Sequence, residues 1–73
     1  MTKDNFWINM ETYIPEIYWE DLMYMGEVNG ISLYKHYFTR NYINVDSKGC
    51  FYEYCNNKYI LINKDNAINH ILH

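Results

Sequence analysis

The stretch YINVDSKGCFYEYCNNKYILIN, residues 42–63, decides the fold. Aromatic and β-branched residues dominate it, and turn residues interrupt it at two places. Residues 46–49 (DSKG) predict a type I turn followed by a left-handed glycine. Asn56 and Asn57 predict a two-residue hairpin loop, because asparagine tolerates positive φ better than most residues with a side chain. The segment therefore predicts three antiparallel strands, over Tyr42–Asp46, Cys50–Cys55 and Lys58–Asn63.

The two turns also set which residues face each other across these strands. Around the first turn the expected pairs are Asp46–Cys50, Val45–Phe51, Asn44–Tyr52, Ile43–Glu53 and Tyr42–Tyr54. Around the second turn they are Cys55–Lys58, Tyr54–Tyr59, Glu53–Ile60, Tyr52–Leu61 and Phe51–Ile62. Both registers agree on which side chains share a face of the sheet.

Side chains alternate between the two faces of a sheet, so the registers predict one apolar face and one tyrosine face. The apolar face collects Ile43, Val45, Phe51, Ile60 and Ile62, with Glu53, Cys55 and Lys58 among them. The tyrosine face collects Tyr42, Tyr52, Tyr54, Tyr59 and Leu61, with Asn44 and Cys50. We expect the apolar face to pack in the core.

The upstream sequence predicts one more strand and one helix. Ile31–Phe38 has the same aromatic and aliphatic composition as the later strands. In Pro15–Met25, proline suits the first helical position, the acidic residues favour the N-terminal half of the helix dipole, and the glycine that follows suits the stop. At about 100° per residue this helix is amphipathic. Its outward side carries Glu16, Glu20 and Glu27.

The two ends of the chain complete the expected fold. The apolar segment Phe6–Ile14 predicts a short helical turn or strand. Asn63 or Asp65 is suited to cap a C-terminal helix. The apolar stripe of that helix is Ala67, Ile68, Ile71 and Leu72. We therefore expect a single α+β domain over residues 1–73, with an N-terminal amphipathic helix, an antiparallel meander of three to four strands and a short C-terminal helix.

Composition excludes several classes of protein. With 73 residues, 49% of them hydrophobic and 21% charged, the chain suffices for one folded domain and no more. No uncharged run approaches the roughly 20 apolar residues that a membrane-spanning helix needs. The start, Met1–Asn5, lacks the features of a secretory signal, so we expect a cytoplasmic protein. Cys50 and Cys55 lie roughly 16 Å apart along one predicted strand, which is too far for a disulfide, so we expect free thiols.

The sequence holds no specific catalytic or metal-binding motif. His70 and His73 share one face of the predicted C-terminal helix. A zinc site there also needs His36 or Asp65, and neither is assured. Either cysteine with a histidine is a candidate nucleophile pair, yet one small sheet offers little cleft to exclude water. We expect no metal, no cofactor and no enzymatic activity.

Charge and aromatic content indicate a binding surface. Residues 1–30 carry one basic residue against six acidic ones and residues 31–73 carry five against three, so the net charge is −3. Nine tyrosines, three phenylalanines and two tryptophans exceed what one small core needs. Tyrosine presents a large ring at low entropic cost, which suits recognition. The residues expected to bind a partner are Tyr42, Tyr52, Tyr54 and Tyr59, with Glu16, Glu20 and Glu27 at the rim.

We expect a small acidic protein-binding module. The bias toward asparagine, isoleucine and tyrosine is typical of an AT-rich coding sequence. The hypothesis therefore extends to an inhibitor, encoded by a phage or mobile element, that occupies the surface of a host enzyme such as one that handles nucleic acid, as anti-CRISPR proteins do. One alternative is a homo-oligomeric structural or regulatory protein, for example a homodimer through the tyrosine face. Another is a single-stranded nucleic-acid binder, which needs a basic groove that an acidic chain disfavours.

Overall fold

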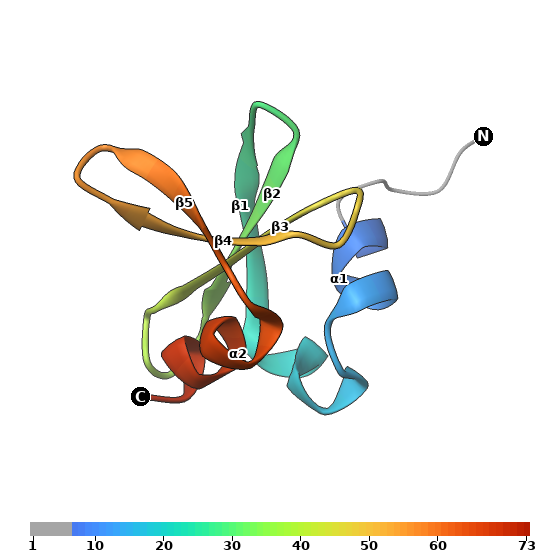
Figure 1. The fold of residues 1–73 in the computed structure, drawn as a ribbon. Coiled ribbons are helices and arrows are strands. Elements are labelled where there is room, and N and C mark those ends of the chain that lie inside the picture. The colour runs from blue at the N-terminus through green and yellow to red at the C-terminus, as the bar shows by residue number, and fades with distance from the viewer. Residues whose placement is uncertain (1–6) are drawn as a thin grey trace.

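The structure, a computed structural model, describes residues 7–73. Within them, five strands join in chain order into one antiparallel sheet (Figure 1). The strands are β1 (Leu22–Val28), β2 (Ile31–His36), β3 (Tyr42–Asp46), β4 (Phe51–Cys55) and β5 (Lys58–Ile62). The helical elements are α1 (Ile8–Tyr13), the 3-10 helix η2 (Glu16–Asp21) and α2 (Lys64–Leu72). The fold is α+β as predicted, with five strands where three to four were expected.

Both turns predicted in the stretch 42–63 are confirmed. Gly49 has a left-handed φ of 88°, and its N–H donates to the carbonyl of Asp46. A Cβ added at this glycine would also lie 2.7 Å from a ring carbon of Tyr13, so both backbone and packing favour glycine here. Asn56 and Asn57 have φ of 52° and 67°, and they form the two-residue loop between β4 and β5.

The predicted register is confirmed next to both turns. It is wrong at the end of the β3–β4 pair that lies far from the turn. All five expected pairs link β4 to β5. Between β3 and β4 the pairing ends at Asn44 and Tyr52. The two further expected pairs, Ile43–Glu53 and Tyr42–Tyr54, do not form, because the strands diverge there. We name this divergence, between residues 42–43 of β3 and 53–54 of β4, the strand fork; in Figure 1 the β4–β5 hairpin swings away from β3.

The helix predicted over Pro15–Met25 is wrong. Its first part is the short η2, and from Leu22 onward the chain is strand β1. This strand pairs with β2 along its whole length, and Met25 is the extra residue of a β-bulge. Its side chains alternate between sheltered and exposed positions over the first residues. Because an isolated helix of this length is marginal in water, pairing with β2 decides the conformation.

The sequence signal for this strand is the dipeptide Asn29-Gly30. Both residues have positive φ, at 51° and 84°, and they form a two-residue hairpin between β1 and β2. Asn-Gly between two apolar runs is a strong hairpin signal. This hairpin signal outweighs Pro15 and the acidic residues after it, which had predicted a helix. The N-terminal helix of the fold is instead α1, in the segment expected to form a helical turn or strand; Phe6 of that segment lies outside the described residues.

Strand β2 ends at His36, two residues before the predicted end at Phe38. The His36 side chain is buried, and its Nδ1 accepts hydrogen bonds from the backbone N–H groups of Phe38 and Thr39. These bonds turn the chain out of the sheet. Tyr37 and Phe38 therefore lie on the loop between β2 and β3.

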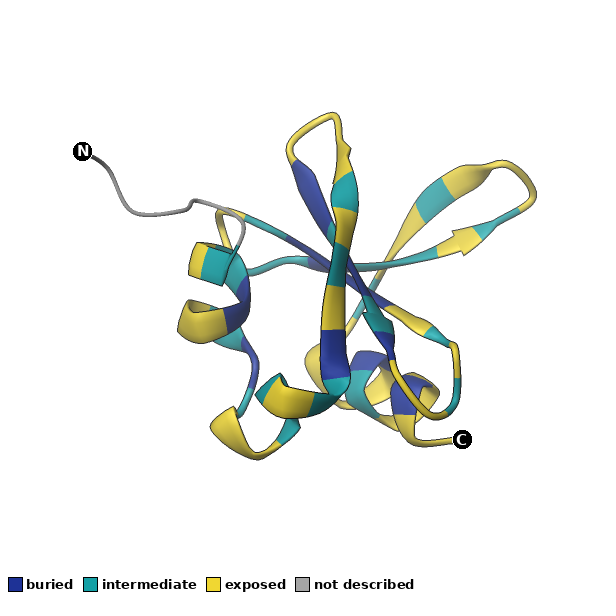
Figure 2. Cartoon of the chain, turned by 180° about the vertical axis from the view of Figure 1, so that it is seen from behind, coloured by how far each residue is buried: buried dark blue, intermediate teal, exposed yellow. Residues whose placement is uncertain are grey.

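The core lies between the predicted apolar face of the sheet and the helices. Ile43, Val45 and Phe51 are buried there, as expected. They pack with Met10, Ile14, Leu22, Tyr34, Ala67 and Ile71. Ile60 of the same predicted face is exposed. The tips of the β1–β2 and β4–β5 hairpins project beyond the helices, as Figure 2 shows, so alternation along a strand decides burial only near its base.

The C-terminal helix α2 is confirmed, with Asn63 as its cap. The Asn63 side-chain oxygen accepts a hydrogen bond of 2.8 Å from the N–H of Asn66. Ala67 and Ile71 are buried against the sheet. The helix packs on β3 and β4 together, so it spans the strand fork.

Candidate partner-binding cleft

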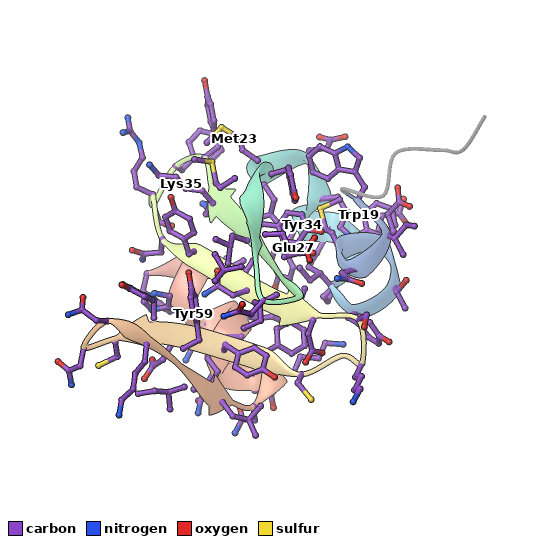
Figure 3. All side chains as sticks on the ribbon, turned by 90° about the horizontal axis from the view of Figure 1, so that it is seen from above. Trp19, Met23, Glu27, Tyr34, Lys35 and Tyr59 are labelled. Atoms are coloured by element: carbon purple, nitrogen blue, oxygen red, sulfur yellow. The ribbon has the colours of Figure 1, made fainter. Side chains whose placement is uncertain are left out.

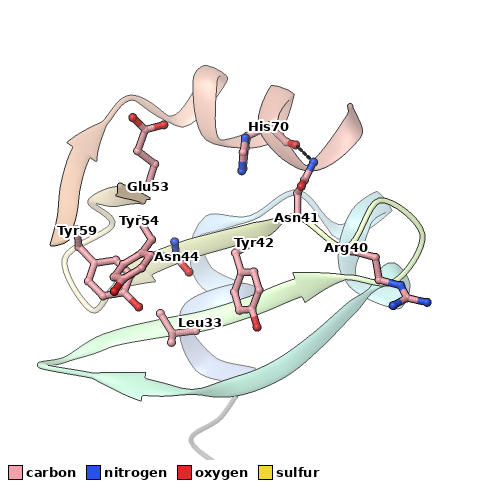
Figure 4. A pocket seen from close by; sticks show the side chains of 9 residues that line it. All are labelled: Leu33, Arg40, Asn41, Tyr42, Asn44, Glu53, Tyr54, Tyr59 and His70. Atoms are coloured by element: carbon pink, nitrogen blue, oxygen red, sulfur yellow. Dashed lines mark hydrogen bonds between the residues drawn. The ribbon is translucent and has the colours of Figure 1, made fainter. Parts of the chain in front are cut away.

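A cleft of about 460 Å³ opens at the strand fork, and we name it the fork cleft. The end of α2 that borders it is tied to the β2–β3 loop. The side-chain amide of Asn41 donates to the carbonyl of His70 at 2.9 Å, and the Thr39 hydroxyl donates to the carbonyl of Ile71 at 2.7 Å. The residues that line the cleft are Leu33, Arg40, Asn41, Tyr42, Asn44, Glu53, Tyr54, Tyr59 and His70 (Figure 4).

The fork brings side chains from both predicted faces to one place. Tyr42, Tyr54 and Tyr59 belong to the tyrosine face, whereas Glu53 belongs to the apolar face. A continuous ladder would keep Glu53 on the other side of the sheet from these rings. Because the ladder stops at the fork, Glu53 lines the same cleft as the tyrosines.

The two ends of the fork cleft differ in chemistry. Tyr54 and Tyr59 lie together at one end and Arg40 lies at the other, whereas the Glu53 side chain points away from the two rings, toward the α2 side of β4 (Figure 4). The Tyr54 and Tyr59 ring centroids are 4.9 Å apart with the planes tilted by 53°. Tyr54 is 59% exposed, so much of its ring meets solvent. His70 of α2 lies between these ends in the same view.

Tyr42 already binds a cation within the molecule. The Lys35 Nζ atom lies 5.9 Å from the centroid of the Tyr42 ring. Lysine is attracted to the negative face of an aromatic ring at this distance. Lys35 therefore occupies one side of the Tyr42 ring from within the chain.

Asn44 lies at the point where the strands part and is only 2% exposed. Its Nδ2 donates to the backbone carbonyl of Tyr52 at 3.0 Å. A carbonyl only accepts, so this bond fixes the orientation of the amide. The Oδ1 atom is buried and has no hydrogen-bond partner among residues 7–73. In Figure 4 it points toward Leu33 and Tyr54, on the cleft side.

Tyr52, the fourth tyrosine predicted to bind a partner, lies outside the cleft and stabilises the first turn. Its hydroxyl donates to the Asp46 carboxylate at 2.9 Å, and this hydrogen bond, with burial, raises the pKa of Tyr52. The N–H groups of Lys48 and Cys50 donate to the same carboxylate. Burial opposes ionisation of Asp46, but the hydrogen bonds outweigh it and lower the pKa of Asp46.

The acidic residues predicted at the rim lie away from the tyrosines. Glu16 and Glu20 are exposed on η2, beside Trp19. Glu27 is exposed on β1, and Figure 3 shows Glu27 and Tyr59 on different hairpins. None of the three lines the fork cleft. The structure therefore does not join these carboxylates and the tyrosines in one site.

Sequence reasoning missed a second aromatic surface, the aromatic turn formed by Tyr37 and Phe38. Both side chains are exposed, and their ring centroids lie 5.3 Å apart in an edge-on arrangement. Arg40 lines both the fork cleft and a hollow beside this turn, so the two surfaces adjoin. The polar run that begins at Thr39 is typical of a loop and could have indicated that the strand ends earlier.

Within residues 7–73, no cluster of three or more histidine, cysteine or acidic side chains is placed to hold a metal ion. His36 Nδ1 accepts bonds from the backbone, whereas His70 and His73 are exposed. Cys50 and Cys55 are free and half-buried. No helix of the described chain has the length and apolar content needed to cross a membrane.

Comparison of the chain with protein-family models, curated proteins and solved structures finds no significant match. The class of site is therefore defined by geometry alone. It is a cleft lined by tyrosine and polar side chains, in the sheet of an α+β domain.

Proposed function

We propose that the protein is a protein-binding module and that the fork cleft is its main binding surface. The observation that carries this proposal is that Tyr42, Tyr54 and Tyr59, three of the four tyrosines expected to bind, line one cleft. Binding energy in protein interfaces concentrates in aromatic and arginine side chains at partly enclosed central positions. Large exposed apolar patches likewise mark interaction sites.

The aromatic turn supports the same proposal. Tyr37 and Phe38 extend the exposed aromatic area from the cleft past Arg40. A chain of this size has a stability of only a few kcal/mol, at roughly 0.05 to 0.15 kcal/mol per residue. Rings left in solvent contribute little to that stability, so a role in binding accounts for them better than a role in folding.

The finer hypothesis is an inhibitor, encoded by a phage or mobile element, that acts by occupying a host enzyme. Small size, an acidic net charge and a free aromatic surface support it. Surface occupation needs no catalytic group. The competing hypothesis of a homo-oligomer predicts that the same cleft meets a second copy, and one experiment separates the two.

The experiment places a photo-crosslinking phenylalanine derivative at position 54 or position 61 in cells that express the protein. Leu61 is the matched control, since it is 63% exposed against 59% for Tyr54 and lies on the adjacent strand outside the cleft. We expect an adduct with another protein from position 54 and none from position 61. An adduct of twice the chain's mass would indicate the homo-oligomer. Equal adducts from both positions, or none, would contradict the proposal.

A further inference from the structure

We propose that the aromatic turn binds an acidic segment of the protein partner, with a carboxylate of that segment on Arg40 and an apolar side chain against Phe38. This inference rests on the proposed function, because it names the chemistry that the partner presents next to the fork cleft. Three observations support it: exposed rings on a fixed backbone, an arginine in a left-handed conformation, and a hollow lined by two cations.

Hydrogen bonds fix the backbone that carries the aromatic turn. His36 Nδ1 accepts from the N–H groups of Phe38 and Thr39, and the His36 carbonyl accepts from the Arg40 N–H at 2.9 Å. The His36 N–H donates to the carbonyl of Asn41 at 2.7 Å. The side chains of Thr39 and Asn41 donate to carbonyls of α2. Because this loop is held in one shape while its rings meet solvent, it loses little conformational freedom on binding.

Arg40 has a left-handed φ of 68°. Within residues 7–73, the other residues with a side chain and positive φ are all asparagine, which tolerates this backbone better than arginine does. The Arg40 side chain is exposed, and Figure 4 shows its guanidinium group pointing away from the other side chains of the fork cleft. Neither the turn nor the core therefore requires arginine here. Residues held in such backbone cluster at functional sites, which points to a role for the guanidinium group.

The charge of the partner segment follows from the hollow beside the aromatic turn, which has a volume of about 400 Å³ and which we name the basic hollow. The residues that line it are Met23, Lys35, Tyr37, Phe38 and Arg40. Among residues 7–73, two of these five are cationic and none is acidic. Asp21 accepts the Tyr37 N–H through its backbone carbonyl at 2.6 Å, and its carboxylate does not line the hollow. The basic hollow therefore favours carboxylates, which arginine binds through two parallel hydrogen bonds.

Lys35 joins the basic hollow to the fork cleft. It pairs with Met23 on β1 and with Tyr42 on β3, and directly opposite residues share one face of a sheet. Figure 3 shows Met23 and Lys35 close together on this face. The Lys35 Nζ atom lies 5.9 Å from the centroid of the Tyr42 ring. A segment bound on the aromatic turn therefore continues directly into the fork cleft.

The rest of the molecule favours a short acidic segment over a long polyanion. The net charge of the chain is −3, and charges act over roughly 8 Å at physiological ionic strength. A nucleic acid or an anionic membrane extends beyond the basic hollow and meets this negative charge. The ring planes of Tyr37 and Phe38 lie at 86° to each other, so a base cannot stack between them.

The test is an NMR titration of the ¹⁵N-labelled full chain with a capped peptide that has glutamates on both sides of one phenylalanine. The matched probe replaces every glutamate with glutamine. We expect the acidic peptide to shift the backbone amides of Phe38, Thr39 and Arg40 at a concentration about fivefold lower than the glutamine peptide needs. Equal responses to the two peptides, or shifts confined to other parts of the chain, would overturn the proposal.

Two further probes separate an acidic peptide from other polyanions. One is single-stranded oligothymidylate, and the other is a vesicle of phosphatidylserine and phosphatidylcholine. We expect neither to shift the amides of residues 37–40 at the concentration of negative charge at which the peptide does. A stronger response to the oligonucleotide would assign the basic hollow to nucleic acid, and a stronger response to the vesicle would assign it to a membrane. Either result would overturn the proposal.

A pair of charge variants locates the carboxylate site. Arg40→Asn removes the cation and suits the positive φ, so it should fold as the unchanged chain does and weaken the acidic peptide about threefold. The control Lys58→Gln removes an exposed positive charge from the β4–β5 hairpin and should leave the affinity unchanged. Equal losses in the two variants would show that only net charge matters and would overturn the assignment to Arg40.

A pair of apolar variants locates the contact with the phenylalanine of the probe. Phe38→Ala should weaken both peptides about fivefold, because the ring contact does not depend on charge. The control Leu61→Ala truncates a side chain that is 63% exposed against 71% for Phe38, and it should change neither affinity. Unchanged binding by Phe38→Ala would overturn the apolar part of the proposal.

This inference and the proposed function fail in different ways. If the acidic peptide leaves residues 37–40 unshifted while position 54 crosslinks a partner, the acidic segment is overturned and the binding module stands. If the acidic peptide binds at the aromatic turn while position 54 crosslinks no partner, the aromatic turn stands as a binding site and the fork cleft is overturned as the main surface.

Discussion

The two ends of the β3–β4 pair differ in how their polar groups are satisfied. At the turn end, one carboxylate, Asp46, accepts hydrogen bonds from two backbone N–H groups and from the Tyr52 hydroxyl. Phe51, the first residue of β4, is buried in the core. At the fork end, the strands separate, Asn44 keeps an acceptor without a partner in the described chain, and Tyr54 is largely exposed.

Under the proposed function, β4 serves stability at its beginning and binding at its end. The turn end satisfies its polar groups internally and buries its aromatic ring, which is how a small domain gains stability. The fork end leaves the Asn44 oxygen without a partner in the described chain and the Tyr54 ring largely exposed. Substitutions at the turn end should therefore change stability, and substitutions at the fork end should change binding.

The largest effect should come from truncating aromatic rings at the two ends of β4. Phe51→Ala removes a buried ring and should lower the free energy of unfolding by about 3 kcal/mol or more, which approaches the whole stability of a chain this small. Tyr54→Ala removes an exposed ring and should cost less than about 1 kcal/mol. Urea denaturation followed by circular dichroism measures both. Equal losses would contradict the division between the two ends.

The next largest effect should be on the affinity for the partner. Tyr54→Ala should weaken the partner complex by about 2 kcal/mol, or about 30-fold, chiefly through faster dissociation. Tyr52→Phe keeps the ring, loses the hydroxyl bonded to Asp46 and should bind as the unchanged protein does. Surface plasmon resonance checks both predictions, with the partner that crosslinking at position 54 identifies. Circular dichroism first has to show that each variant folds. If Tyr52→Phe weakens binding as much as Tyr54→Ala does, the interface extends to the turn end.

Replacing Asp46 should have a smaller effect on the free energy of unfolding, and this effect should depend on pH. Folding lowers the pKa of Asp46 below its ordinary value of 3.8, so the ionised form favours the folded state. This stabilisation is complete above pH 3.8 and is lost as the pH falls through the folded pKa. Asp46→Asn should cost about 1 kcal/mol at pH 7, because a charged acceptor is lost.

Urea denaturation at pH 7 and pH 3 checks this prediction. The gap in stability between the unchanged chain and Asp46→Asn should narrow at the lower pH. A gap of the same size at both values would show that the charge of Asp46 does not stabilise the turn.

The smallest effect should come from the carboxylates of η2. Glu16→Gln with Glu20→Gln should slow association by about two- to threefold at low salt and leave dissociation unchanged, because peripheral charges steer encounter more than they hold a complex. Stopped-flow measurements at two salt concentrations check this. If the double variant abolishes binding even at high salt, η2 and not the fork cleft is the main surface.

The sequence is informative where local geometry allows few alternatives. Gly49 and the pair Asn56-Asn57 accept left-handed backbone that most residues avoid, so both turns and the pairs next to them are predictable. Pro15–Met25 is different, since residues that start and stop helices there coincide with an alternating pattern. Asn29-Gly30, a few residues downstream, resolves the choice in favour of a strand.

The sequence by itself determined the α+β class, the turns within residues 42–63, the pairing of β4 with β5 and the cap at Asn63. Each of these depends on residues close together in the chain. Only the tertiary structure decided where the pairing of β3 and β4 stops. At that point α2 packs across both strands, a long-range contact that no local pattern encodes. Leu33, Glu53 and His70 line one cleft because long-range packing brings together segments that are far apart in the sequence.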